Sequence, residues 1–321
     1  MKRPHTRLFA IALSALVLTA VAQARLPDVP AVANPKSMTV PSEAIQAAGI
    51  RSQTAWTHRV GPAGALEEGH RSSSVSYDKE GNPLEQIAYD ENGVVLQSII
   101  NTYDGEGRLV ESVSEEHTGT ADARTIFAYE GERIIATMAY RPDGSLLVST
   151  QYEYDKDGNV VGSLTEVPDA NISQRIAFEY SADGDVIRSV SYDSAGNVVA
   201  TSETVNDGDG RPLRSTAFLP DGTVGSVTIY TYDSDGLLLD LTVRDAEGTV
   251  LQTVSKVYDL DGLMVELVTS KPPAGIEQTV VVEYDEEEQR LTEQTYNKRG
   301  QLVGETRYVY EYYGDQGDTQ D

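Results

Sequence analysis

The chain of 321 residues contains no cysteine. No disulfide can form, and no cysteine can serve as a nucleophile or as a ligand for zinc or iron. Histidine is scarce as well, with four residues, none at metal-ligand spacing from another. The sequence also lacks a GxSxG nucleophile elbow and a phosphate-binding glycine loop. These absences predict a protein that has no cofactor and is not an enzyme.

Basic residues are few, because 25 lysines and arginines stand against 51 aspartates and glutamates, for a formal net charge of −26. A surface of this sign repels the phosphate backbones of nucleic acids and anionic lipid headgroups. We therefore expect neither nucleic acid nor a membrane surface among the partners of the protein.

Long hydrophobic runs are missing beyond residue 21. Residues 8–21 (LFAIALSALVLTAV) are apolar, the preceding MKRPHTR is basic, and AQA at residues 22–24 is suited to cleavage. This three-part pattern predicts a signal peptide at residues 1–24 and export to the periplasm or the cell exterior. The alternative is a membrane anchor, but the apolar run is shorter than the about 20 residues that span a bilayer. We expect no membrane insertion of the mature chain.

The mature chain divides into three regions of different composition. Residues 25–70 form a proline-rich lead-in, in which SEAIQAAG can fold as a short helix capped by Ser42. Trp56, the only tryptophan, is expected to cover one end of the following sheet. Residues 71–313 carry a repeat, and residues 314–321 form an acidic tail.

The repeat is visible as two alternating series of turn positions, each with a step of about 26 residues. The first series runs through Gly81, Gly107, Gly131, Gly158, Gly184, Gly210, Gly236, Gly262 and Glu288. The second series runs through Gly93, Gly119, Gly144, Ala170, Gly196, Gly222, Gly248, Gly275 and Gly300. A regular spacing of this length predicts an array of identical structural units.

Each half of the unit has an aromatic residue, an aspartate, two polar residues and a glycine, as in YDENGVV, YDGEGRL, YDSAGNV and YDSDGLL. The aspartate can accept hydrogen bonds from backbone N–H groups two residues on, and the glycine tolerates a left-handed backbone. The pattern predicts a type I turn that closes with a glycine bulge. The residues assigned to these turns are Tyr77, Asp78, Gly81, Tyr103, Asp104, Gly107, Tyr154, Gly158, Tyr192, Gly196, Tyr232, Gly236, Tyr258 and Gly262.

Between the turns lie eight to ten residues rich in valine, threonine, isoleucine, tyrosine and serine, which predict strands. We expect an all-β fold, a long twisted antiparallel meander of about 18 strands from nine repeats. Such a sheet should curl into an open spiral or half-pipe, because flat sheets of this width are rare. The tyrosines of the two series should point to opposite faces of the sheet.

The tandem YDxxGxL/V units resemble the YD-repeat, or Rhs-like, family of bacterial exported proteins. The resemblance covers residues 72–313, and Gly107, Arg108 and Leu109 give the fuller GRL form. It implies strands of a long coiling antiparallel sheet, which in that family sometimes forms a shell around a toxin. In this sequence the repeats are followed by the acidic GDQGDTQD, and we therefore do not expect toxin encapsulation.

One turn, EYDKDGNVV at residues 153–161, also has acidic residues at the spacing of calcium ligands. A calcium loop supplies five or more oxygens and usually ends in a bidentate glutamate, which no unit offers. We therefore expect hairpin turns rather than metal sites. The weak metal candidates are Asp155, Asp157, Asn159, Asp207 and Asp209.

Three turns depart from the pattern, at residues 115–123, 167–173 and 270–278, and all belong to the second series. Alternate turns of a meander emerge on one edge, and loops on a rigid scaffold commonly carry binding. The partner-binding candidates are His117, Asp169, Asn171 and Lys271. We expect a non-enzymatic binding or structural scaffold for an unidentified protein or glycan. The alternatives are a carbohydrate-binding module with tyrosine ladders, an outer-membrane barrel, or a glycan hydrolase.

Overall fold

A computed structural model of the protein describes residues 42–116 and 123–314. The predicted signal peptide, residues 25–41 of the proline-rich lead-in, His117 and all but the first residue of the acidic tail lie outside these ranges. Within them the chain is almost entirely β-structure, with one short α-helix and one 3-10 turn. The all-β prediction is confirmed.

The elements follow one another along the chain with short connections. The helical elements are α2 (Ser42–Ala48) and η2 (Pro168–Ala170). The strands are β1 (Ile50–Arg59), β2 (His70–Tyr77), β3 (Pro83–Tyr89), β4 (Val95–Tyr103), β5 (Leu109–Glu116), β6 (Ala123–Glu130), β7 (Arg133–Tyr140), β8 (Leu146–Tyr154), β9 (Val160–Val167), β10 (Ile172–Tyr180), β11 (Val186–Tyr192), β12 (Val198–Asn206), β13 (Pro212–Phe218), β14 (Val224–Tyr232), β15 (Leu238–Asp245), β16 (Val250–Tyr258), β17 (Met264–Lys271), β18 (Gly275–Tyr284), β19 (Arg290–Asn297) and β20 (Leu302–Tyr312).

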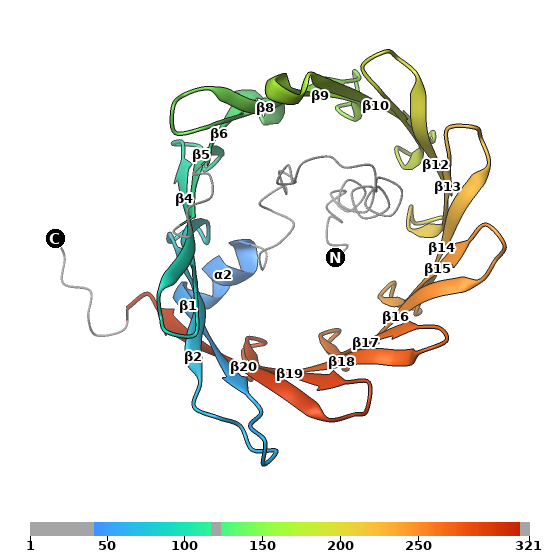
Figure 1. Cartoon of the computed structure of the whole chain (residues 1–321). Coiled ribbons are helices and arrows are strands. Elements are labelled where there is room, and N and C mark those ends of the chain that lie inside the picture. The colour runs from blue at the N-terminus through green and yellow to red at the C-terminus, as the bar shows by residue number, and fades with distance from the viewer. Residues whose placement is uncertain (1–41, 117–122, 315–321) are drawn as a thin grey trace.

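Every strand pairs antiparallel with the next, and β1 pairs with β20, so the sheet closes into a 20-stranded up-and-down barrel (Figure 1). This corrects two predictions: the sheet is neither an open spiral nor a half-pipe, and it has 20 strands rather than about 18. The two additional strands are β1, which lies in the predicted lead-in, and the strand with which the meander ends.

Closure depends on β1, which is hydrogen-bonded on both sides. Thr54 in this strand has Ser74 of β2 as one cross-strand partner and Val309 of β20 as the other. A closed barrel leaves no unpaired edge to invite association with another chain. The lead-in therefore completes the sheet, and does so as a strand rather than as a separate cover.

Helix α2 shows which face of the sheet is the inside. It lies within the ring in Figure 1, and Ile45, which is 1% exposed, belongs to a buried cluster with Ile50 and Tyr77. Val75, Tyr310 and Tyr312 pack against this cluster. Cross-strand partners have their side chains on the same face of the sheet, and successive residues along a strand alternate between the two faces. The inward-facing residues of every strand can therefore be identified by following the register from this cluster.

The two tyrosine series lie on opposite faces, as predicted. Tyr103 is inside, because Val75 pairs with Gln86, Gln86 with Ile99, and Ile99 is four residues before Tyr103 on the same face. Tyr89 is outside, where its hydroxyl lies 3.3 Å from that of Ser74. Trp56 is also on the outside, opposite Arg71 and 39% exposed, and so does not cover an end of the sheet.

The turns have the predicted hydrogen bonds. In the turn after β11, the Asp193 carboxylate accepts from the backbone N–H groups of Ala195 and Asn197. The N–H of Gly196 donates to the Asp193 carbonyl, and Gly196 has a φ of 81°. A register shift at the aromatic residue before most of these turns adds one extra residue to the following strand.

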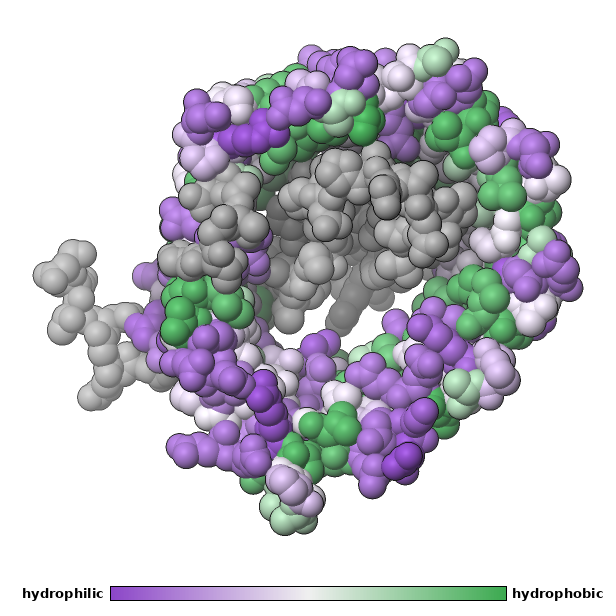
Figure 2. All heavy atoms as spheres, in the orientation of Figure 1, coloured by the Kyte–Doolittle hydropathy of each residue, from purple (hydrophilic) through white to green (hydrophobic). Residues whose placement is uncertain are grey.

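The outer wall carries charged side chains within its strands as well as at the turns. Arg188 forms ion pairs with Glu179 and Glu203 across three neighbouring strands. Arg124 and Glu111 form another pair on the same face. Hydrophilic and hydrophobic residues alternate around the ring in Figure 2. The outer surface is therefore mixed rather than uniformly apolar.

Candidate functional site

The two mouths of the barrel differ in charge. Turns that follow even-numbered strands form one mouth, which we call the acidic mouth, and its turns hold 19 acidic and four basic residues. The described turns that follow odd-numbered strands form the opposite mouth, with nine acidic and three basic residues. Both counts include only the residues that lie between consecutive strands and exclude those within the strands. The negative charge of the protein is therefore concentrated at one end of the barrel.

Each turn of the acidic mouth contributes acids in a fixed arrangement. The first is the aspartate that organises the turn, replaced by Ser181 in the turn after β10, and the second stands two residues later. The second acids are Glu80, Glu106, Glu132, Asp157, Asp183, Asp209, Asp235, Asp261 and Glu287, where Glu132 belongs to a shorter turn. Successive turns are two strands, or about 10 Å, apart. This spacing is close to the Debye length in physiological salt, so the fields of neighbouring turns overlap.

The two kinds of acid have different environments. Asp104 is 23% exposed and accepts hydrogen bonds from the backbone and guanidinium of Arg108, which lower its pKa. Asp207 is 18% exposed and has the same contacts with Arg211. The second acids Glu106 and Asp209 are 67% and 76% exposed. The first acid therefore holds the turn, while the second presents charge to the solvent.

The turn EYDKDGNVV has this arrangement. Asp155 accepts hydrogen bonds from the backbone N–H groups of Asp157 and Asn159 and from the Asn159 side-chain amide. These bonds, led by that of the amide, lower the pKa of Asp155. Its oxygens are therefore used within the turn. In residues 42–116 and 123–314, no three histidine, aspartate or glutamate residues are grouped to hold a metal ion.

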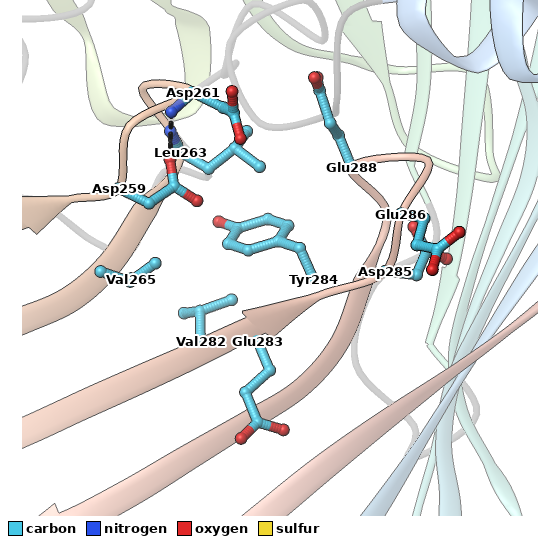
Figure 3. Close-up of a pocket in the computed structure, with 10 residues that line it drawn as sticks. All are labelled: Asp259, Asp261, Leu263, Val265, Val282, Glu283, Tyr284, Asp285, Glu286 and Glu288. Carbon is cyan, nitrogen blue, oxygen red and sulfur yellow. Dashed lines mark hydrogen bonds between the residues drawn. The ribbon is translucent and has the colours of Figure 1, made fainter.

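A pocket of about 620 Å³ opens at the acidic mouth between β17, β18 and the adjoining turns. In Figure 3 the ring of Tyr284 lies at its centre, with Val265 and Val282 beneath. The lining carboxylates belong to Asp259, Asp261, Glu283, Asp285, Glu286 and Glu288. The pocket thus combines an apolar floor with an acidic lip.

Glu288 is at a position where the other turns of this series have glycine. Its φ of 63° is in the left-handed region, and its N–H donates to the carbonyl of Asp285 in the usual way. A side chain here costs conformational energy that glycine avoids. The substitution adds one more carboxylate to the lip of the pocket.

Below the acidic turns, a belt of tyrosines encircles the lumen. Each hydroxyl donates to the carbonyl of the residue 20 positions earlier, at the start of a strand in the neighbouring hairpin, at 2.7–3.0 Å. The donors are Tyr103, Tyr129, Tyr154, Tyr180, Tyr232, Tyr258, Tyr284 and Tyr310. Asn206 takes the place of a tyrosine and makes the same bond through its amide to Val186. The belt joins each hairpin to the next.

Arginines cover the rings of several belt tyrosines. Arg108 lies over Tyr129 at 5.0 Å from the ring centroid, and Arg211 lies over Tyr232 at 5.3 Å. Arg133 lies over Tyr154 at 5.5 Å. These cation–π contacts occupy ring faces that a stacked sugar would need. The arrangement assigns these tyrosines to the wall of the barrel.

Three of the predicted partner-binding residues, Asp169, Asn171 and Lys271, are at or beside the opposite mouth but are not brought together. Asp169 forms an ion pair with Arg141 at 2.6 Å, and Lys271 forms one with Glu277 at 3.6 Å. Asn171 ends the η2 turn with a φ of 50°. The turns after β9 and β17 share this mouth but lie on different arcs of the ring, with strands β10 to β17 between them.

The acidic second position of the turns was missed when the sequence was considered alone. The information was present, since the two turn series could have been compared by charge as well as by spacing. The apolar floor of the pocket could not be found this way. Val265 and Val282 are on adjacent strands, and only the cross-strand register shows that they meet.

A model for a family described only as an uncharacterised protein matches residues 63–147. No curated protein matches the sequence. None of the helices in the described residues has the length and apolar character needed to cross a lipid bilayer.

Among solved structures, a porin-like protein from Bacteroides uniformis is similar at 9% identity and a TM-score of 0.36, covering 82% of this chain and 98% of that one. The TcdB2-TccC3-Cdc42 structure is similar at 14% identity and a TM-score of 0.29, with 81% of this chain covered. The chain spans only 17% of the length of that protein. These scores are low, so the fold assignment rests on the strand pairing alone.

Proposed function

We propose that the protein is an exported, non-enzymatic binding module that receives a positively charged partner at its acidic mouth. The observation that carries the proposal is the unequal charge of the two mouths. An exported location is supported by the signal-peptide pattern of residues 1–24. The YD-type resemblance of the turns belongs to the same proposal, as a repeat that builds the scaffold.

Electrostatics favours the mouth over the outer wall as the place of recognition. Outer-wall charges such as Arg188, Glu179 and Glu203 are arranged in pairs of opposite sign, which weakens their field at a distance. Glu106, Asp157 and Asp209 pair with Arg108, Lys156 and Arg211, but the turns of this mouth hold 19 acidic and only four basic residues, so most of their charge is not compensated. A ring of like charges raises the local concentration of cations and speeds their association.

The mixed outer wall also supports a protein that works in water. A barrel wall that faces lipid carries an apolar band, and a charged side chain there costs several kcal/mol in midplane. The Arg188 cluster and the Arg124–Glu111 pair lie on the outer wall between the mouths. We therefore propose that the mature chain does not insert into a membrane.

The proposal is tested with residues 25–321 and a short polycation, such as a lysine decamer, titrated by calorimetry at low and physiological salt. One variant neutralises the second acids of four turns, as Glu80→Gln, Glu106→Gln, Asp209→Asn and Asp235→Asn. The control variant neutralises four acids of the opposite mouth, as Glu67→Gln, Glu68→Gln, Glu91→Gln and Glu247→Gln.

The acidic-mouth variant should bind the lysine decamer at least about tenfold more weakly than the wild-type protein, and the control variant should lose less than about threefold. Equal losses in the two variants would show that net charge alone acts and would overturn the proposal. Absence of measurable binding to the wild-type protein at low salt would overturn it too.

A further inference from the structure

The acidic mouth has an apolar lining just inside its rim. The extra strand residue that follows each turn of this mouth is a leucine, valine or isoleucine in all nine repeats: Leu84, Val110, Ile135, Val161, Ile187, Leu213, Leu239, Val265 and Leu291. We call this set the apolar band.

The band faces the lumen. Arg214 pairs with Ile229, which places Leu213 beside the inward-facing Tyr230. Thr292 pairs with Arg307, which places Leu291 beside Tyr308 in the same way. Several members of the band remain substantially exposed: Leu84, Ile135, Ile187, Leu213 and Leu291 are 37–42% exposed. An apolar surface of this kind inside an acidic ring is unusual for a wall that faces only water.

Helix α2 shows what the inner wall of this mouth accepts. It sits inside the mouth at β1, β2 and β20, and its Ile45 is buried among aromatic residues of the tyrosine series, including Tyr77 and Tyr310. An aliphatic side chain from a helix is therefore already buried against the inner wall of this mouth, where it packs on tyrosines rather than on the apolar band. The cluster around Ile45 lies against β1, β2 and the end of β20.

The pocket in Figure 3 lies on another arc of the same mouth. Tyr284 is one 26-residue repeat before Tyr310, and Val265 is one repeat before Leu291. Its Tyr284 corresponds to Tyr310, which packs against the cluster that holds Ile45. At its lip, Leu260 is fully exposed between Asp259 and Asp261. The pocket thus combines an apolar surface on its floor with carboxylates at its lip.

The mouth is also wide enough for a second helix. Twenty strands at about 4.8 Å give a ring at least about 30 Å across between backbones, and strand tilt widens it. A helix with its side chains is about 10–12 Å in diameter.

We propose that the acidic mouth binds a cationic amphipathic peptide segment, whose apolar side chains occupy the apolar band and whose lysines or arginines meet the acidic turns. This inference rests on the proposed function. It adds the chemical class of the partner and the apolar surface that the partner would contact. The acidic turns favour a cationic partner because the charges are complementary. The burial of Ile45 on the inner wall favours a partner with an aliphatic face. A small polycation alone would use only the rim.

The test uses residues 25–321 and two synthetic helical peptides of identical composition, built from lysine, leucine and alanine. One peptide has its leucines on one helical face, and the other has them scrambled. A third peptide replaces lysine by glutamate in the amphipathic order. Binding is measured by fluorescence anisotropy, with Leu213→Ser and Ile187→Ser in the band and Leu251→Ser on the opposite mouth as the matched control.

The amphipathic cationic peptide should bind at least about tenfold more tightly than the scrambled one. The double band variant should remove this difference, while Leu251→Ser should leave it intact. Equal binding of the two cationic peptides would overturn the amphipathic partner while leaving the polycation site of the proposed function standing. Preference for the acidic peptide would overturn both.

A further experiment tests whether residues 25–41 of this protein compete with the peptide for the same surface. The same titration is repeated with a chain that begins at Ser42. Similar affinities for the two chains support a separate partner. If only the shortened chain binds the peptide, that surface belongs to residues 25–41 of this protein, and the proposal of a separate partner is overturned.

Discussion

At the scale of the residue, the turn is built by one aspartate and one glycine with separate tasks. The aspartate orders the backbone through its carboxylate, and the glycine allows the left-handed step that ends the turn. The turn at residues 104–108 contains a second glycine that isolates these effects. Gly107 has a φ of 76°, while Gly105 has no left-handed φ, and an added Cβ would meet nothing within 4 Å at either position.

Replacing Gly107 by alanine should therefore destabilise the fold by about 1–2 kcal/mol, the cost of a left-handed backbone for a residue with a side chain. Gly105→Ala should change the free energy of unfolding by less than about 1 kcal/mol, because no strain opposes it. Urea unfolding followed by circular dichroism measures both. Equal effects of the two substitutions would mean that the turn conformation is not what glycine supplies.

The turn aspartates also predict how stability depends on pH. Hydrogen bonds from Asn159 and Asn197, side chain first and backbone next, lower the pKa of Asp155 and Asp193. The fold therefore favours the ionised forms. Their contribution is complete above the ordinary pKa near about 4 and is lost as the pH falls through the lowered values. The melting temperature should drop steeply below about pH 4 in high salt, which screens general charge repulsion.

Asparagine provides the control for this effect, because Asn297 organises the turn before β20 with the same backbone hydrogen bonds and cannot titrate. A variant with Asp155→Asn and Asp193→Asn should melt with a weaker dependence on acid pH than the wild type. A dependence as steep as that of the wild type would assign acid sensitivity to other groups.

At the scale of the element, each hairpin is joined to the next by a tyrosine of the belt as well as by the sheet. The Tyr232 hydroxyl donates to the carbonyl of Pro212 at 2.9 Å. Burial raises the pKa of Tyr103, and likewise that of Tyr77, to about 12. These phenols are therefore held in the neutral, donating form far above physiological pH.

Tyr232→Phe should destabilise the fold by about 0.5–1.5 kcal/mol, since it removes the donor and leaves the Pro212 carbonyl without that partner. Tyr140→Phe should have a smaller effect, because the Tyr140 hydroxyl contacts only the weakly accepting sulfur of Met138 at 3.5 Å. Chemical unfolding of the two variants separates these outcomes. A larger loss for Tyr140→Phe would contradict a structural role of the belt.

Alkaline titration tests the same belt without a mutation. For a tyrosine with a raised pKa, the stabilising contribution is complete below the unfolded value near about 10 and is lost as the pH rises through the folded value of about 12. Phenolate absorbance should therefore appear in a late phase between about pH 10 and 12 that coincides with loss of β-structure. Ionisation of all tyrosines near pH 10 in the folded protein would contradict this.

At the scale of the whole molecule, β1 and α2 make different contributions although they adjoin in sequence. Strand β1 closes the ring, and α2 packs on its inner surface through Ile45. Thr54→Pro removes a backbone donor from a strand that is paired on both sides. It should open the ring and expose the edges of β2 and β20, which size-exclusion chromatography detects as oligomers.

Ile45→Ala should weaken the packing of α2 but leave the ring closed and the protein monodisperse. Truncation of a buried isoleucine typically costs about 2–5 kcal/mol, and here that loss falls on the docking of the helix. Hydrogen exchange should show faster exchange in α2 with β1 and β20 still protected. Loss of protection throughout β1 would show that the helix is needed for closure.

The sequence by itself determined the repeat, the strands, the turn chemistry and the opposite faces of the two tyrosine series. All of these follow from interactions within a few residues or from the alternation of side chains along a strand. The hydrogen bonds of Asp155 and Asp193 and the left-handed Gly196 are local consequences of this kind.

Only the tertiary structure decided closure, strand number and the composition of the mouth. Strand β1 has no turn motif of its own, and its pairing with β20 joins residues about 250 positions apart, as between Thr54 and Val309. No local pattern encodes such a contact. The pocket around Tyr284 depends in the same way on register across strands, and the acidic ring exists as a ring because the sheet closes and brings the last turns beside the first.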